Sequence, residues 1–432
     1  MKYTFEAGAA REIITPPVGS RLYGYNDHTV SASLHDDLTA TALAVRQGED
    51  CALLLSVTLC EIEVAMQQKI RETLSLHTGV PVKNILLSCT HTHCGPNLCG
   101  NNGCGPVDWD YYNNIFMPRV TQAAQNALAS LAPAEYAVGE TESKVGINRR
   151  DMLADGTYHM GQNPFALIDP TLTAVTFRNA ETKQEFFCLL HYGCHGTSAG
   201  NCDIITRDWS GLMIDRVEGE TGLLTAYWNG SEGDVGPRLN NGSTAGTIED
   251  TEMLGAIAGE DALRAVAARG EYRPGELKIV CGELAVPYLA PPPAEELQAK
   301  LEELAGTKEN GVGGFIKYTF YERLLQMVTS GEPLPTHFVV PQTLVSLGDV
   351  VIVPYPFEMF AETVLRLRRF INKPYVLCLS VTNGFEQYLP TESDICRGGY
   401  EVDCLLYGHP LPMPHNTEQQ LMNATLALAE QL

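Results

Sequence analysis

Long apolar runs are missing from this sequence. No run reaches the length that spans a membrane, and the opening residues, Met1 to Glu6, lack the apolar stretch of a secretory signal. We therefore expect a cytoplasmic protein that does not cross a membrane. A mature secreted protein whose signal peptide has been removed would have the same sequence, so secretion is the alternative to a cytoplasmic location.

Lysine and arginine are also scarce. The chain has 29 of them against 52 aspartates and glutamates, which gives a formal net charge of -23. This excess of negative charge repels phosphate backbones and anionic lipid surfaces, and the sequence has no evident basic amphipathic helix. The composition thus excludes nucleic acid as a partner and argues against stable membrane association.

The sequence also lacks the short, even-numbered set of cysteines that is typical of a disulfide framework. The thirteen cysteines are odd in number and scattered, as is typical of free thiols in a reducing compartment. Cys94, Cys99 and Cys104 recur at five-residue intervals, but their loop contains no CxxC pair. That spacing disfavours a structural metal site in this loop.

What is present fits a large globular enzyme, since 44% of the 432 residues are hydrophobic and 19% are charged. Apolar strand patterns alternate with helical ones. We expect strands over 51–57, 84–89, 172–177, 185–192 and 350–354. We expect helices over 63–78, 249–268 and 294–305, and a further helix that follows residue 359 and ends at about 370. The alternation predicts an α/β fold with layered sheets flanked by helices. We expect a single domain, 1–432, with a helical insertion at about 290–335 and an exposed glycine-rich loop at 308–314.

Two histidines, His91 and His93, follow the apolar strand 84–89 directly. Side chains alternate along a strand, so residues two apart share a face. Neutral imidazoles are strong zinc ligands, and a pair of them at a strand end is a natural beginning for a metal site. Surface or hydrogen-bonded core histidines are the alternative, so the metal hypothesis depends on ligands elsewhere in the chain.

Five sequence motifs occur in a characteristic order. They are Thr90-His-Thr-His93 with Gly95-Pro96, Cys194-His-Gly-Thr-Ser198, Gly233-Asp-Val-Gly-Pro237, Phe357-Glu-Met-Phe360 and Gln387-Tyr-Leu-Pro-Thr391. In this set and order the chain resembles the neutral/alkaline, non-lysosomal ceramidase family along almost its whole length. The match covers that family's catalytic domain.

The resemblance implies a zinc ion held by His91, His195, Glu358 and Tyr388. Two imidazoles, a carboxylate and a weakly filled position are typical of a catalytic zinc site. Alternatives stay open for three of these residues. His195 could be a buried core histidine, Glu358 could belong to the first turn of a helix, where the dipole favours it, and Tyr400 or Tyr407 could replace Tyr388.

Further active-site residues follow from the same resemblance. His93, which shares the face of His91, would then lie beside the metal and hydrogen-bond a zinc-bound hydroxide or a developing oxyanion, and Arg149 would orient a carbonyl or carboxylate. Asp208 would be either the partner of a ligand histidine or a helix N-cap. We add Tyr400 as a catalytic candidate. The candidates for substrate contact are Asn97, Asp234 and Gly236.

Gly236 departs from the family pattern. Members of the family carry Gly-Asp-Val-Ser-Pro, whose serine has been proposed as a nucleophile, and this chain has glycine in its place. Any hydrolysis must then come from a zinc-activated water. The family's secreted members also continue into a β-sandwich domain that has no counterpart before Leu432, so we expect a substrate other than ceramide in a bilayer.

The sequence therefore predicts a zinc-dependent hydrolase that cleaves the amide bond of a small N-acyl compound. Esters, lactones and acetylated sugars are alternative substrates, because the same metal centre would act on any acyl carbon. A second alternative is a non-catalytic protein that binds a metal or ligand. The oligomeric state stays open.

Overall fold

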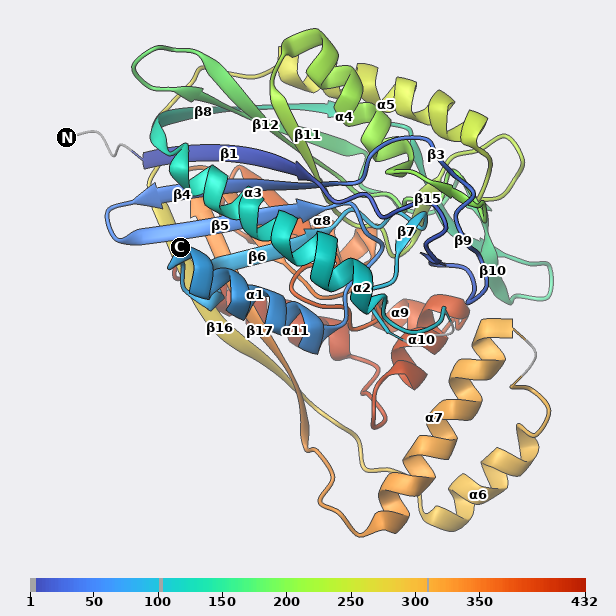
Figure 1. Cartoon of the computed structure of the whole chain (residues 1–432). Coiled ribbons are helices and arrows are strands. Elements are labelled where there is room, and N and C mark those ends of the chain that lie inside the picture. The colour runs from blue at the N-terminus through green and yellow to red at the C-terminus, as the bar shows by residue number, and fades with distance from the viewer. Residues whose placement is uncertain (1–4, 101–103, 309–310) are drawn as a thin grey trace.

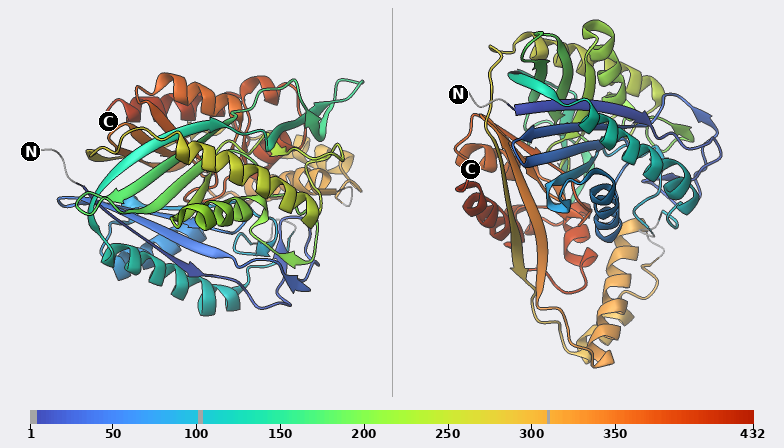
Figure 2. Two further views of the ribbon diagram at one scale, coloured as in Figure 1. Left: turned by 90° about the horizontal axis from the view of Figure 1, so that it is seen from above. Right: turned by 60° about the vertical axis from the view of Figure 1, so that its left-hand side comes forward.

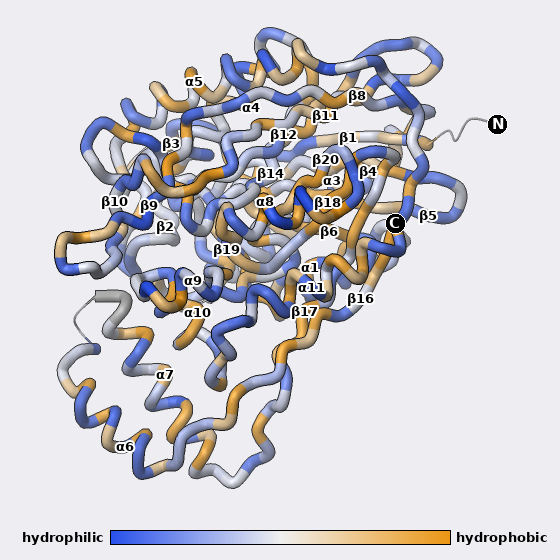
Figure 3. The backbone as a smooth tube through the Cα atoms, turned by 180° about the vertical axis from the view of Figure 1, so that it is seen from behind, coloured by the Kyte–Doolittle hydropathy of each residue, from blue (hydrophilic) through white to orange (hydrophobic). Residues whose placement is uncertain are grey.

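The computed structural model describes residues 5–100, 104–308 and 311–432. Four layers follow one another: helices, an eight-stranded sheet, a four-stranded sheet, and helices again (Figures 1 and 2). Apolar segments concentrate on the inner strands, as Figure 3 shows. The predicted fold class, α/β with layered sheets and flanking helices, is confirmed.

The eight-stranded sheet mixes parallel and antiparallel neighbours. Its strands in spatial order are β14 (Leu224–Asn229), β12 (Glu185–Tyr192), β11 (Thr171–Asn179), β8 (Ala132–Glu142), β1 (Phe5–Ile13), β4 (Thr39–Gln47), β5 (Asp50–Val57) and β6 (Ile85–Cys89). Alternate residues face opposite layers because strand side chains alternate. In β4, Ala42 and Ala44 pack toward the helices, whereas Leu43 and Val45 enter the core between the two sheets.

Helices cover the outer face of this sheet. Those over one half are α1 (Val64–Thr78) and a continuous helical stretch made of α2 (Trp109–Tyr111), a π-helical turn (Tyr112–Phe116) and α3 (Met117–Ala129). Those over the other half are α4 (Asp208–Thr221) and α5 (Ile248–Ala267). A capping box formed by Thr247 and Asp250 fixes the start of α5.

The four-stranded sheet has the order β16 (Leu277–Pro287), β17 (His337–Leu347), β18 (Val350–Pro354) and β20 (Tyr375–Leu379). Its outer face packs against α8 (Ala361–Phe370) and α11 (Thr417–Ala429). Between β16 and β17 the chain forms α6 (Ala294–Glu303) and α7 (Gly311–Ser330), which extend from the body as an arm (Figure 1).

Short elements complete the structure. They are β2 (Leu22–Tyr23) with β7 (Gly95–Pro96), β3 (Ser33–Leu34) with β13 (Ile204–Ile205), β9 (Gly146–Met152) with β10 (Tyr158–Asn163) and β15 (Val235–Pro237), β19 (Glu358–Met359) with β21 (Tyr388–Leu389), a 3-10 turn (Val82–Asn84), α9 (Glu392–Ile395) and α10 (Tyr400–Gly408). None of the helices in the described part of the chain is both long and apolar enough to span a bilayer.

Most predicted elements match the structure within a few residues. The strands 172–177 and 185–192 pair antiparallel as β11 and β12, and the strand 350–354 is β18. The loop predicted at 308–314 is partly wrong, because α7 begins at Gly311; residues 309 and 310 lie outside the described chain. The helices α6 and α7 occupy the segment 290–335, while the single-domain assignment stays a prediction.

One edge of this architecture collects strand ends from both sheets. The pairs β5–β6, β12–β14 and β18–β20 are each parallel, so the carboxyl ends within each pair lie together. Hydrogen bonds join these ends: Asn229 Nδ2 donates to the Thr90 carbonyl at 3.2 Å, and the Ser380 amide donates to the Asn229 carbonyl at 3.0 Å. The loops that leave these strands therefore meet in one place.

Candidate metal centre

His91, His195 and Glu358 converge at this edge from three different strands. His91 follows β6, His195 follows β12, and Glu358 lies in the short strand β19 after β18. One ligand atom from each residue lies within 4.8 Å of the others. The Nε2 atoms of His91 and His195 are 3.6 Å and 3.0 Å from the Oε2 atom of Glu358. All three side chains are buried.

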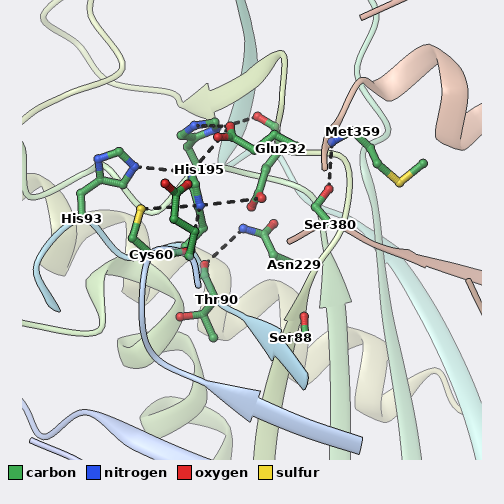
Figure 4. Close-up of polar contacts among 12 residues, drawn as sticks. Cys60, Ser88, Thr90, His93, His195, Asn229, Glu232, Met359 and Ser380 are labelled. Carbon is green, nitrogen blue, oxygen red and sulfur yellow. Dashed lines mark hydrogen bonds and ion pairs between the residues drawn. The ribbon is translucent and has the colours of Figure 1, made fainter. Parts of the chain in front are cut away.

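Backbone carbonyls determine which ring nitrogens face the centre. The Nδ1 atom of His91 lies 3.0 Å from the Cys60 carbonyl, and that of His195 lies 2.6 Å from the Glu232 carbonyl. Because a carbonyl only accepts, each Nδ1 must donate, which leaves the lone pair on Nε2. Both Nε2 atoms lie within 3.6 Å of Glu358 Oε2, and Figure 4 shows Glu232 and His93 close to His195.

This arrangement fits a divalent cation. The Oε2 atom of Glu358 is buried without a hydrogen-bond partner, although two unprotonated nitrogens face it. Burial lowers the pKa of both His91 and His195 well below the usual range, so both rings are neutral at pH 7, as ligands must be. Two imidazoles and one carboxylate form the ligand type that suits zinc.

The backbone at His91 is not an extended strand. β6 ends at Cys89, and His91 adopts a positive φ of 68°, a conformation that is costly for a residue with a Cβ atom. His93 still lies beside it, with 3.4 Å between the two Nε2 atoms. The prediction that the pair lies together is therefore confirmed, but strand alternation is the wrong reason, since a loop brings the rings together.

Tyr388 and Arg149 border the centre. Tyr388 is directly opposite Glu358 in the parallel pair β19–β21, and its ring stacks on that of His195 at a centroid distance of 6.4 Å. Arg149 is buried in β9 and contacts both neighbours, with Nη1 2.9 Å from His195 Nε2 and Nη2 donating to the Tyr388 hydroxyl at 2.9 Å. The predicted ligands and Arg149 therefore form one contact network.

A cavity of about 970 Å³ opens from this network. His91, His93, Glu358, Tyr388 and Tyr400 all line it. Aromatic residues of the N-terminal segment and of α7 line other parts of the cavity, and they are Tyr23, Tyr25 and Phe315. Tyr400 also packs edge-on against Tyr388, with ring centroids 5.7 Å apart, so it lies next to the predicted fourth ligand.

His93 is held by residues that the sequence did not single out. Its ring lies 5.0 Å from that of Tyr25, measured between centroids. A Cβ atom at Gly24, whose φ is +129°, would lie 2.5 Å from the His93 ring. Burial lowers the pKa of His93 to about 4, so this imidazole is neutral at pH 7 and able to accept a proton.

The structure places Glu358 outside the first turn of a helix and Asp208 away from the ligand histidine rings. Glu358 precedes α8, which begins at Ala361, so it is not in the first turn of that helix. The Asp208 carboxylate accepts from the amides of Ser198, Ala199 and Trp209, and thereby fixes the loop after His195. The hydrogen bonds of this carboxylate go to that loop and to α4 rather than to a histidine ring.

The three candidates for substrate contact lie outside the residues that line the cavity. The Asn97 side chain accepts from the amides of Cys99 and Gly100 and donates to the Gly105 carbonyl, so it shapes its own loop. Asp234 accepts from Asn148 Nδ2 and from the Ala361 amide. Their role in substrate binding stays a prediction to which this geometry adds no support.

Gly236 is tightly packed in β15. A Cβ atom there would lie 2.6 Å from the Cβ atom of Thr244 and 2.7 Å from its Cγ2 atom. We expect Gly236→Ser to lower the free energy of unfolding by about 1–3 kcal/mol through overpacking, without raising activity. Urea denaturation and an amide hydrolysis assay measure the two effects. The double variant Gly236→Ser/Thr244→Gly, which removes the Thr244 Cβ atom as well, should regain part of the stability; equal stability of wild type and Gly236→Ser would contradict the packing argument.

Buried acidic residues near the centre were missed in the sequence. Glu232 is buried with neither carboxylate oxygen hydrogen-bonded, and its Oε1 atom lies 3.9 Å from His91 Nδ1. Burial, followed by the charge of Glu358, raises the pKa of Glu61 to about 8. Glu401 accepts from Arg149 Nε at 3.1 Å and from Arg150 Nη1 at 2.7 Å. Arg149 and Arg150 are both buried, so a buried acidic partner such as Glu401 is required, but the sequence carries no signal that names it.

Comparisons with known proteins point to one family. The family model described as neutral/alkaline non-lysosomal ceramidase, N-terminal, matches residues 5–273. A neutral ceramidase of Mycobacterium tuberculosis is 25% identical over 474 residues, covering 89% of this chain and 71% of the relative. A neutral ceramidase of Pseudomonas aeruginosa is 22% identical over 417 residues, covering 81% of this chain and 60% of the relative.

Solved structures show the same fold. A structure described as a ceramidase complexed with C2 superposes with a TM-score of 0.76 at 17% identity, covering 100% of this chain and 76% of the other. The crystal structure of neutral ceramidase from Pseudomonas aeruginosa gives a TM-score of 0.73 at 18% identity, covering 100% and 75%. Since the family model matches more than half of the chain, this protein belongs to the neutral/alkaline non-lysosomal ceramidase family.

Proposed function

We propose that this protein is a zinc-dependent hydrolase that cleaves the amide bond of an N-acyl compound. The observation that carries the proposal is the convergence of His91, His195 and Glu358 beside a cavity of about 970 Å³. Family membership supports amide hydrolysis, because relatives of this chain are named neutral ceramidases. A cavity of this size holds an acyl chain together with a polar head.

In this proposal His91, His195, Glu358 and Tyr388 hold the ion. Zinc bound there supplies a Lewis acid for the substrate carbonyl and lowers the pKa of a water molecule toward about 7. Arg149 does not itself line the cavity. Its contacts with Glu401 and Tyr388 fix it behind Tyr388, where its charge would help to orient the substrate carbonyl without reorganisation.

The neutral ring of His93 has the position of a hydrogen-bonding partner for the reacting groups. Its Nε2 atom is 3.4 Å from His91 Nε2, and the ring lines the cavity. With a pKa of about 4 it is unprotonated at neutral pH, so a ring nitrogen is free to accept a hydrogen bond from the attacking water and its N–H to donate one to the developing oxyanion. Tyr400, at the cavity wall beside Tyr388, is the further hydroxyl donor available to the substrate.

Metal removal tests the proposal directly. We expect the purified protein to contain about one zinc per chain and to lose amide hydrolysis in 1,10-phenanthroline, because the residues described here leave Glu358 facing unprotonated nitrogens without the ion. Elemental analysis measures the metal, and a series of N-acyl substrates measures the activity. Added zinc should restore the activity.

Matched amide and ester substrates with the same acyl chain separate the proposal from its alternatives. Faster turnover of the ester would favour an esterase or deacetylase. Full activity in protein shown to be free of metal would contradict the proposed function. Bound zinc without hydrolysis of any amide or ester would instead indicate a binding protein, in keeping with glycine at position 236.

A further inference from the structure

Two cysteine sulfurs lie in contact next to the histidine loops. The Sγ atoms of Cys94 and Cys202 are 3.6 Å apart, although 108 residues separate them in the sequence. Cys94 directly follows His93, and Cys202 lies in the loop between His195 and β13. Both cysteines are free thiols in this structure. The fold has thus brought together two reactive groups that the sequence leaves far apart.

The two thiols differ in their surroundings. Cys94 is fully buried, whereas Cys202 is partly exposed and lies between the exposed residues Asn201 and Asp203. A hydrogen bond from the Cys94 thiol lowers the pKa of Cys202. Cys202 is therefore the sulfur that a small reagent in solvent reaches, and Cys94 is the second thiol already in place behind it.

We propose that Cys94 and Cys202 form a dithiol site that hydrogen peroxide or an organic hydroperoxide converts to a disulfide. The Cys202 thiolate attacks a peroxide oxygen, the O–O bond breaks, and Cys202 becomes a sulfenic acid while hydroxide or alkoxide leaves. The Cys94 sulfur then attacks the Cys202 sulfur, the S–O bond breaks, and water leaves with the thiol proton. Two electrons pass from the two thiols to the peroxide in total.

The surrounding backbone favours a disulfide between Cys94 and Cys202 over a disulfide of either residue with another cysteine. The loops are already joined, since the His93 amide donates to the Gly196 carbonyl at 3.1 Å and Thr92 Oγ1 donates to the Thr206 carbonyl at 2.8 Å. The sulfurs need to approach from 3.6 Å to the disulfide length of about 2.05 Å. The exposed loop of Cys202 can supply this movement. Cys94 is less free to move, because its carbonyl accepts from the Thr206 amide and the preceding residue, His93, is bonded to Gly196.

Peptide mapping of the whole protein tests the site. The reduced protein is treated with hydrogen peroxide, the remaining thiols are alkylated, and the digest is analysed by mass spectrometry. We expect a disulfide-linked pair of peptides that contain Cys94 and Cys202, with a mass two hydrogen atoms below the summed masses of the two free peptides. Dithiothreitol should separate this pair. Cys202 should react at least about tenfold faster than the exposed lone thiol of Cys396, which serves as the internal control.

Two variants separate the steps. Cys94→Ser should leave Cys202 as a sulfenic acid that dimedone traps, and Cys202→Ser should abolish the linked peptide while keeping the far-ultraviolet circular dichroism of the wild type. Protein unfolded in urea before oxidation should lose the preference for this pair. Linkage of Cys94 to another cysteine, or oxidation of Cys202 no faster than Cys396, would overturn the proposal.

Discussion

Replacing Glu358 with alanine is expected to abolish metal binding and to lower amide hydrolysis by at least about 10³-fold, since metal and fixed charge supply most of the stabilisation of such a transition state. Glu358 is the acidic member of the group formed with His91 and His195, and its Oε2 atom lies within 3.6 Å of both ring nitrogens. Without it the ion would have two neutral ligands and a phenol. Metal affinity by competition with a chelator and the steady-state rate measure the two losses.

The matched control is Glu296→Ala, which removes an exposed glutamate in the first turn of α6. This variant should retain both metal and activity. Glu358→Gln separates charge from shape, because it keeps the volume of the side chain but removes the negative charge. We expect it to bind zinc more weakly than the wild type. A Glu358→Ala protein with normal metal content and normal rate would refute the proposed centre.

Replacing Arg149 with methionine is expected to lower the free energy of unfolding by about 1–3 kcal/mol, the range for leaving a buried polar group without its partner, because Arg150 still pairs with Glu401. The guanidinium is 4% exposed and contacts Glu401, Tyr388 and His195. Methionine fills part of the volume but leaves the Glu401 Oε1 atom and the Tyr388 hydroxyl without their donors. Urea unfolding followed by fluorescence measures the loss.

Arg216→Met provides the comparison, since Arg216 pairs with Glu220 and Glu260 at the surface and should change stability little. Arg149→Lys tests geometry further. A lysine keeps the charge but cannot donate to three partners in the plane of a guanidinium, so activity should stay low even if stability partly recovers. Equal losses of stability for the Arg149 and Arg216 variants would contradict the assigned role of Arg149.

The candidate site was predictable in part because its residues lie in short motifs. His91, His195, Glu358 and Tyr388 each follow or occupy a strand, and their order along the chain resembles that of a known family. Local polarity patterns also gave most strands and helices, since alternation and helical periodicity depend on neighbours in the sequence. These features need no knowledge of the tertiary structure.

Other parts of the site had no local signal. Glu232 lies in a stretch of small residues, and nothing in that stretch indicates that its carboxylate comes within 3.9 Å of His91. Thr244 is eight residues from Gly236, and only the folded chain shows that it occupies the space a serine side chain would need. Asn97 follows one motif and Asp234 lies within another, yet the hydrogen bonds of Asn97 hold its own loop and those of Asp234 go to β9 and to the start of α8.

By itself the sequence determined the α/β class, the family and the set of candidate ligands, because these depend on patterns along the chain. Tertiary structure alone decided which atoms meet. The carbonyls of Cys60 and Glu232 select the ring nitrogens of His91 and His195 that face Glu358. The packing of two distant loops brings Cys94 into contact with Cys202. The physical reason is that strand ends from two sheets converge at one edge, so partners are selected by packing rather than by distance in the sequence.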